Sequence, residues 1–234
     1  MWHRRLALVT FVCLTMVAFA QQPQMQQQKL AGEAIPNLGV IKSQIKHYYN
    51  CDGTNGCYEA DLEEQAAKAI DFLKQRTSTR KPGEKLAMVL DIDETSLSNY
   101  AYYSLTDFGY ESVRFDMWAL SADAPPIAPT LALFNRAREL GVHVFFITGR
   151  SDMQRFATEQ NLLRAGYKGW EHLYLRTASD LKKTASQYKP EVREKIVRQG
   201  YKIVLNVGDQ ESDLAGDPQA EMSLKLPNPF YYIP

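Results

Sequence analysis

Three short apolar runs constrain the fold of this sequence more than any other feature. They span residues 86–90, 142–147 and 203–207, and polar or acidic residues follow each of them directly. Each run is too short for a helix, and together they are rich in Val, Ile and Phe, which is typical of strands buried on both faces. The sequence therefore predicts parallel strands at these positions, with weaker candidates at 172–175 and 222–226.

Helical patterns separate these runs. The expected helices span 127–140, 151–165 and 190–199, and a glycine that can end the helix follows each stretch. Because strand and helix alternate, we expect an α/β fold with an open parallel sheet and helices on both faces. Two further amphipathic patterns, at 36–49 and 59–76, predict an N-terminal helical segment that packs on the later part of the chain.

The N-terminus carries the pattern of a signal peptide. Arg4 and Arg5 precede an apolar run over 6–20, which ends in the small-x-small sequence Ala-Phe-Ala. We therefore expect residues 1–20 to be removed and the mature protein to be exported, either to the periplasm or into the medium.

We expect no membrane anchor after signal cleavage. The N-terminal apolar run is too short for a membrane-spanning helix, and no other stretch of about 18 apolar residues exists. Cys13 lies inside that run with apolar residues still following, so a lipid anchor is not favoured. The Gln-rich residues 21–35 predict a flexible leader.

Cys51 and Cys57 are the cysteines that remain after signal cleavage. In an exported protein, an even pair separated by a turn-prone loop favours a disulfide. Two free thiols, or half of a metal site, are the alternatives.

The balance of charge excludes one class of partner. The 27 Lys and Arg residues match the 27 Asp and Glu residues, and the pI is about 6.9. A protein that binds a nucleic acid polymer is expected to carry a strongly basic face, which this balance does not indicate.

Acidic and hydroxyl side chains follow the three apolar runs. Ligands of an open parallel sheet bind beyond the carboxyl ends of its strands, so these side chains should converge on one crevice. Carboxylates so close together repel each other unless a cation lies between them, and Mg²⁺ is the first candidate. Helix capping would explain one such aspartate but not four. The residues concerned are Asp91, Asp93, Thr148, Asp209 and Asp213.

Four segments resemble the motifs of the haloacid dehalogenase (HAD) superfamily, in the form of its subfamily IIIB acid phosphatases. This branch includes bacterial class C and class B acid phosphatases and plant vegetative storage proteins. With the similar C-terminal stretch 226–234, the resemblance covers about residues 38–234 and implies a HAD-like, Rossmannoid fold. The four segments are Asp91-Ile92-Asp93-Glu94-Thr95, Phe146-Ile147-Thr148-Gly149-Arg150, Tyr188-Lys189 before a charged helix, and Gly208-Asp209-Gln210-Glu211-Ser212-Asp213.

The resemblance assigns a role to each motif residue. Asp91 would be the nucleophile that forms an aspartyl-phosphate, and Asp93 the general acid and base. Thr148 and Lys189 would hold the phosphoryl oxygens, although without the family a solvated surface charge is the alternative for Lys189. Mg²⁺ would be held by the Asp91 carboxylate, the Asp93 backbone carbonyl and Asp209, and Asp213 would bind it through a water or orient the other ligands.

Substrate recognition is expected to involve two regions. The long link at about 94–126 predicts a small inserted cap, in which Tyr103 and Trp118 are candidates for stacking on a base or aromatic leaving group. The alternative is that most of the cap aromatics form the core of the cap itself. Gly149 and Arg150 follow Thr148 and are candidates for substrate binding, whereas Arg150 could equally cap a helix or pair with an aspartate.

The sequence thus predicts an exported Mg²⁺-dependent acid phosphatase over residues 36–234, which forms one HAD-like domain. The expected substrates are small phosphate monoesters such as nucleotide monophosphates or aryl phosphates, and a homodimer is an open expectation. A non-catalytic storage or ligand-binding protein is the first alternative, and the presence of Asp91 argues against it. A phosphotransferase that uses the same intermediate is the second.

Overall fold

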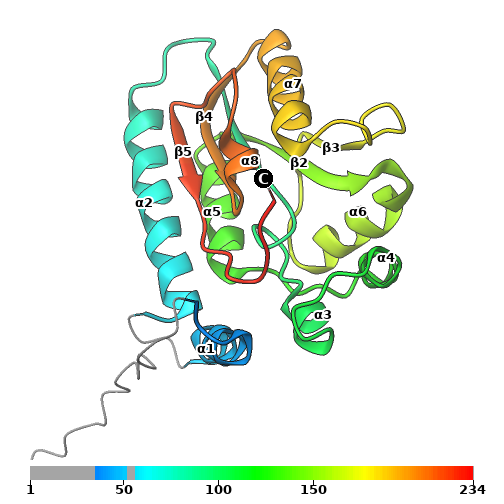
Figure 1. The fold of residues 1–234 in the computed structure, drawn as a ribbon. Helices are drawn as coiled ribbons and strands as arrows, with labels where there is room; N and C mark the ends of the chain where they lie inside the picture. The colour runs from blue at the N-terminus through cyan, green and yellow to red at the C-terminus, as the bar shows by residue number, and fades with distance from the viewer. Residues whose placement is uncertain (1–34, 52–55, 234) are drawn as a thin grey trace, which may run out of the picture. The chain divides into compact units, whose positions relative to one another are not determined.

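Five parallel strands form a single sheet in the order β3-β2-β1-β4-β5 (Figure 1). This confirms the predicted open parallel sheet, including its two weaker strands. The strands are β1 (Lys85–Leu90), β2 (His143–Ser151), β3 (His172–Arg176), β4 (Tyr201–Gly208) and β5 (Met222–Lys225).

The structure is a computed structural model that describes residues 35–51 and 56–233. All elements described here belong to one unit that spans residues 37–234. The predicted signal peptide at 1–20 and nearly all of the predicted leader at 21–35 lie outside the described residues. Among the described helices, none is long and apolar enough to cross a membrane.

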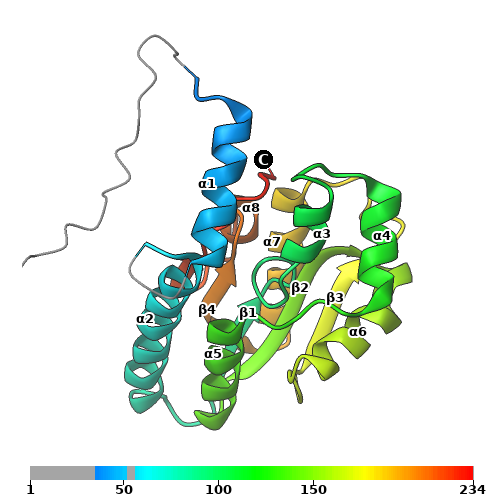
Figure 2. The same ribbon diagram turned by 90° about the horizontal axis from the view of Figure 1, so that it is seen from below.

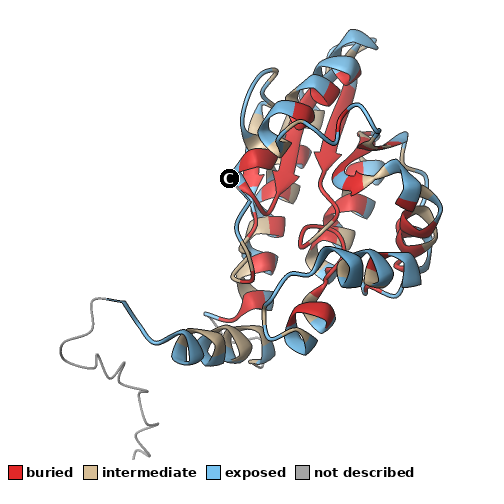
Figure 3. Cartoon of the chain, turned by 45° about the vertical axis from the view of Figure 1, so that its right-hand side comes forward, coloured by how far each residue is buried: buried red, intermediate tan, exposed pale blue. Residues whose placement is uncertain are grey.

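Helices cover both faces of the sheet (Figure 2). On one face lie α2 (Tyr58–Ser78), α5 (Ala128–Glu139) and α6 (Arg155–Arg164), and on the other lies α7 (Ala185–Arg198). The strands are accordingly buried along most of their length, while the outer sides of the helices are exposed (Figure 3).

The central strand β1 shows why an uninterrupted apolar run was the correct signal. Leu86, Met88 and Leu90 point into the core beneath α2 and α5, and Ala87 and Val89 point into the core beneath α7. Successive side chains of a strand face opposite sides, so a strand covered on both faces needs apolar residues at every position.

The position of α7 corrects one expectation. The sequence predicts a helix that begins at Pro190, whereas α7 begins five residues earlier, at Ala185, with a capping box on Thr184. Pro190 has no backbone N–H to donate to the preceding turn, yet α7 runs through it to Arg198. Lys189 therefore lies inside the helix rather than before it, and the helix fixes its direction.

The N-terminal helices and the cysteine pair agree with the sequence. Helix α1 (Leu38–Asn50) precedes α2, and a disulfide joins Cys51 to Cys57 with their Cα atoms 5.8 Å apart. The region expected to form a cap contains two helices, α3 (Tyr100–Leu105) and α4 (Ser112–Ser121), which come between β1 and α5 in the sequence.

Replacing Cys51 and Cys57 by serine is expected to lower the free energy of unfolding by only about 2 kcal/mol, because the bridge closes a small loop. Urea unfolding of the double variant beside the oxidised parent measures the difference. Failure of the double variant to fold would instead show that the bridge holds the whole domain together.

Candidate active site

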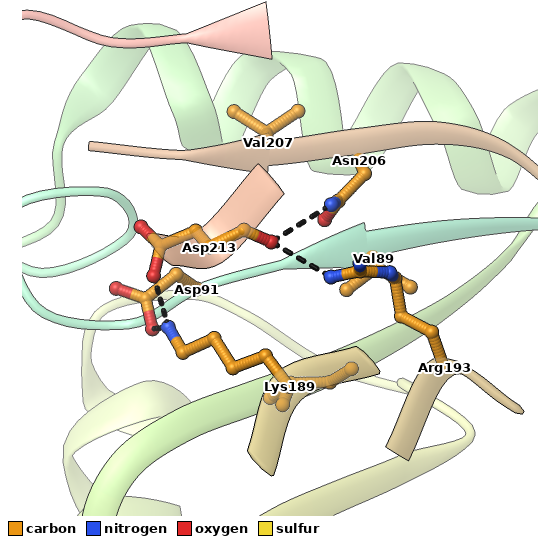
Figure 4. A pocket seen from close by; sticks show the side chains of 8 residues that line it. Val89, Asp91, Lys189, Arg193, Asn206, Val207 and Asp213 are labelled. Carbon is orange, nitrogen blue, oxygen red and sulfur yellow. Dashed lines mark hydrogen bonds and ion pairs between the residues drawn. The ribbon is translucent and has the colours of Figure 1, made fainter. Parts of the chain in front are cut away.

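Four charged side chains meet at the carboxyl ends of β1 and β4, and three of them, Asp91, Asp213 and Lys189, are drawn in Figure 4. Asp91 directly follows β1, Asp209 directly follows β4, and Asp213 lies on the short helix α8 (Glu211–Leu214). Lys189 reaches them from α7. All four residues are at most 7% exposed. The topology therefore brings together motif residues that are more than 100 positions apart in sequence.

Lys189 is held between two of the carboxylates. Its Nζ lies 2.6 Å from Oδ1 of Asp91 and also donates to Oδ1 of Asp213. Burial opposes the charged ammonium, but the carboxylates of Asp213 and Asp91 outweigh it, so the pKa of Lys189 lies above its ordinary value. The alternative of a solvated surface lysine is therefore wrong.

The three carboxylates of this group could bind one cation together. Asp91, Asp209 and Asp213 each offer an oxygen within 4.8 Å of the others. Burial, reinforced by Asp213, raises the pKa of Asp209 to about 6, and burial also raises the pKa of Asp91. One ammonium does not balance three buried carboxylates, so a divalent ion that prefers oxygen ligands fits this site on charge and on donor type.

Asp93 lies in a separate hydrogen-bonded group. The guanidinium of Arg150 contacts both of its carboxylate oxygens at 2.7–3.1 Å, and Asn99 Nδ2 donates to Oδ1 at 2.9 Å. Burial disfavours the ionised form, but Arg150 outweighs it, so the pKa of Asp93 lies below its ordinary value. Asp93 is thus held in one orientation in its ionised form.

The three residues of the second motif behave differently from one another. The side chain of Arg150 is 1% exposed and pairs with Asp93, which was one of its expected roles, so it does not point toward a substrate. Thr148 is buried, and its hydroxyl accepts a hydrogen bond from the Arg150 amide at 3.1 Å. Gly149 is exposed, and no atom lies within 4 Å of the place where its Cβ would be.

The two aromatic candidates of the cap are occupied by contacts inside the protein. Tyr103 is 3% exposed, and its ring centroid lies 5.1 Å from that of Tyr231, so it belongs to the core rather than to a substrate surface. Trp118 is half-buried and donates from Nε1 to Oδ1 of Asn99 at 2.8 Å. Trp118 thereby orients the amide that contacts Asp93.

Comparison with known proteins identifies the family to which this site belongs. The family model of the HAD superfamily, subfamily IIIB (acid phosphatase), matches residues 12–234. The chain belongs to this family. Acid phosphatase 1 of Solanum lycopersicum is 45% identical over 148 residues, which are 62% of this chain and 58% of that protein.

This subfamily IIIB chain is also similar to a storage protein and to a bacterial acid phosphatase of known structure. Vegetative storage protein 1 of Arabidopsis thaliana is 37% identical over 150 residues, which are 62% of this chain and 55% of that protein. The structure of the class C acid phosphatase from Bacillus anthracis has a TM-score of 0.66 and 26% identity, and the match covers 83% of this chain and 85% of that one. The chain spans less than two thirds of the length of the curated relatives it matches.

Several residues that shape this subfamily IIIB site were not singled out from the sequence. Asn206 of β4 and Arg193 of α7 both donate to the backbone carbonyl of Asp213, at 3.0 and 2.9 Å. Gly208 is required because a Cβ there would overlap the side chain of Asp213. Asn206 did carry a signal, since it is a polar residue within the apolar run 203–207 of β4.

Glu94 is a buried carboxylate beside the site. It has a φ of 54°. Its carboxylate accepts hydrogen bonds from the backbone amide of Asn99 at 2.6 Å and from the Tyr231 hydroxyl at 2.9 Å. Burial, together with Asp93 and Asp209, raises the pKa of Glu94 to about 8, although the bonds from Asn99 work against this shift. In the metal-free protein Glu94 is therefore largely protonated at neutral pH.

This shift predicts how Glu94→Gln changes stability with pH in the presence of a chelator. A carboxyl whose folded pKa is raised contributes stability below its unfolded pKa of about 4.3, and that stability is lost as the pH rises through the folded pKa. Glutamine does not titrate, so the free energy of unfolding of the variant should increase relative to the parent between about pH 5 and 8. Urea unfolding at these two pH values measures the change, and a constant difference would contradict the shift.

Proposed function

We propose that this chain is a Mg²⁺-dependent acid phosphatase that hydrolyses small phosphate monoesters through an aspartyl-phosphate on Asp91. The observation that carries the proposal is the buried group of Asp91, Asp209 and Asp213 around Lys189, with Asp93 two residues from the nucleophile. Membership of the subfamily IIIB acid phosphatases supports it.

In the first step, Asp91 attacks phosphorus. Lys189 donates to one carboxylate oxygen of Asp91, which leaves the other oxygen to form the bond to phosphorus. The bond from phosphorus to the leaving oxygen breaks, and a proton from Asp93 neutralises that oxygen. Lys189 and the Thr148 hydroxyl would hold the phosphoryl oxygens.

In the second step, water displaces Asp91 from phosphorus. Asp93 would accept the proton from the attacking water, and the contact with Arg150 keeps it in the ionised form that can accept a proton. The acid role in the first step needs a proton on Asp93, which the ion pair with Arg150 opposes in the substrate-free protein. Asp91, Asp209, Asp213 and the Asp93 carbonyl would hold a divalent cation, which would neutralise charge so that an anionic nucleophile can approach a phosphate.

Substrate class and export belong to the same proposal. Nucleotide monophosphates and aryl phosphates are the expected substrates, with Gly149 at the open side of the second motif. The burial of Tyr103 removes one of the two aromatic contacts expected for them. The disulfide supports export to an oxidising compartment, periplasmic or extracellular, and the homodimer stays a prediction.

Phosphate release tests the proposal. The substrates are a chromogenic aryl phosphate and a panel of nucleotide monophosphates between about pH 5 and 8, with chelator and then with Mg²⁺ added back. Turnover that chelator abolishes and Mg²⁺ restores is the expected result. No turnover by folded, Mg²⁺-loaded protein would overturn the proposal.

The likeness to vegetative storage protein 1 keeps a storage or ligand-binding role as the second candidate. The same assay separates the two, since a storage protein would fold and give no turnover. Adding excess glycerol or nucleoside to an active preparation then distinguishes hydrolysis from phosphotransfer, because a transferase would yield a phosphorylated acceptor.

A further inference from the structure

The C-terminal strap, defined here as residues 226–233, lies across the carboxyl end of the sheet after β5. It begins with a backbone bond from the Leu226 amide to the Gly208 carbonyl at 2.9 Å. Near its end, the Ile233 amide donates to Oε1 of Gln210 at 2.9 Å. The strap therefore lies along the fourth motif, which carries Asp209 and Asp213.

Asn228 of the strap contacts Asp209 directly. Its Nδ2 donates to Oδ2 of Asp209 at 2.7 Å, while its Oδ1 accepts from the Phe230 amide at 2.8 Å. The Phe230 amide can only donate, so this second bond fixes which end of the Asn228 amide faces Asp209. The strap thus presents an N–H group, rather than a carbonyl, to the carboxylate.

Asp209 is oriented through both of its oxygens. Thr95 Oγ1 donates to Oδ1 at 3.0 Å, and Gln210 Nε2 donates to Oδ2 at 2.6 Å beside Asn228. These contacts fix the rotation of the carboxylate and hence the direction in which its remaining lone pairs point. Groups that hold a ligating carboxylate in this way affect metal affinity without touching the metal.

Phe230 holds the strap in place. It is 6% exposed, and its ring centroid lies 5.5–6.1 Å from the centroids of five other rings. These rings come from α1, α2, α3 and the residues just after α3, and are Tyr49, Tyr58, Tyr100, Tyr103 and Phe108. A ring buried this well fixes the backbone two residues from Asn228.

We infer that the strap is part of the cation site, with Asn228 as a positioning residue for Asp209 and the Phe230 cluster as the structure that fixes Asn228. The inference rests on the proposed function, because it assumes that Asp209 binds the cation. It extends the site to aromatic residues of the N-terminal helices, which are far from the four motifs in sequence.

Mg²⁺ affinity, measured by isothermal titration calorimetry on the folded full chain, tests the inference. Asn228→Ala should raise the Mg²⁺ dissociation constant about tenfold, which is the usual scale for losing a group that orients a ligand. Phe230→Leu should change it in the same direction. The double variant should show less than the product of the two effects, because both variants disturb the same contact.

Two control variants separate positioning from general stability. Tyr232→Ala alters a strap side chain that is 73% exposed, and Phe134→Leu disturbs a buried aromatic of α5 that packs on Phe146 and Tyr167. Phe134→Leu should lower the melting temperature as Phe230→Leu does, and neither control should change the Mg²⁺ dissociation constant. A purely structural strap would instead make Phe230→Leu and Phe134→Leu behave alike.

Phosphate release from the same preparations separates this inference from the proposed function. An active parent whose Asn228→Ala variant binds Mg²⁺ as tightly would overturn the inference and leave the phosphatase intact. A parent that binds Mg²⁺ and shows the expected loss in Asn228→Ala, but releases no phosphate, would support the strap and overturn the phosphatase. A folded parent that binds no Mg²⁺ would overturn the inference.

Discussion

Replacing Asp91 by asparagine is expected to lower the rate of phosphate release by at least about a thousandfold, because the variant lacks the proposed nucleophile. The amide has nearly the same shape as the carboxylate, and its oxygen can still accept the bond from Lys189. The loss should therefore appear in kcat, measured at saturating substrate and Mg²⁺, without a loss of fold.

The same substitution is expected to leave the metal-free protein at least as stable as the parent. Burial raises the pKa of Asp91, and although Lys189 opposes this shift, the carboxylates of Asp213 and Asp209 reinforce it, so ionised Asp91 is unfavourable in the absence of a bound metal ion. A neutral amide removes that repulsion. Urea unfolding in chelator should show an unchanged or higher free energy of unfolding.

Asp71→Asn is the matched control for this variant. Asp71 lies on α2, its side chain is 76% exposed, and its ion pair with Lys74 is a surface pair of small energy. This variant should retain full turnover and parental stability. Turnover by Asp91→Asn within about tenfold of the parent would show that another group attacks phosphorus.

The fold could be predicted from sequence because burial leaves a local record. The unbroken apolar run over residues 86–90 of β1 indicates cover on both faces, and that cover indicates a parallel sheet with helices. Parallel strands place their carboxyl ends along one edge, so Asp91 and Asp209 could be brought together without knowing any loop conformation.

The partners of these residues could not be predicted in the same way. Asn228 contacts Asp209 only because the strap folds back along the fourth motif, and Arg150 contacts Asp93 across 57 residues of sequence. Such pairings depend on the course of each loop, which periodicity does not record. The burial of Tyr103 could not be predicted for the same reason, because the ring that it contacts belongs to Tyr231, near the C-terminus.

Lys189→Met is expected to have the second large effect, on stability as well as on activity. Lys189 is 5% exposed and bonds both Asp91 and Asp213, so its loss leaves two buried carboxylates without a counter-charge. Removing one partner of a buried ion pair costs about 3–5 kcal/mol, which is the expected decrease in the free energy of unfolding in chelator. Phosphate release should fall by about a hundredfold or more, because a phosphoryl ligand is lost.

The pH dependence gives this prediction its sharpest test. Without Lys189, which lowers the pKa of Asp91, that carboxylate takes up a proton more readily, and a raised folded pKa gives stability at low pH that is lost as the pH rises. The stability deficit of Lys189→Met should thus be smaller near about pH 5 than near about pH 8. Mg²⁺ should reduce this deficit at the higher pH, because a cation at the carboxylates replaces the missing charge.

Lys74→Met, which alters a lysine that is 50% exposed on α2, should show none of these changes. A deficit in Lys189→Met that neither pH nor Mg²⁺ alters would mean that Lys189 contributes packing rather than charge to the site.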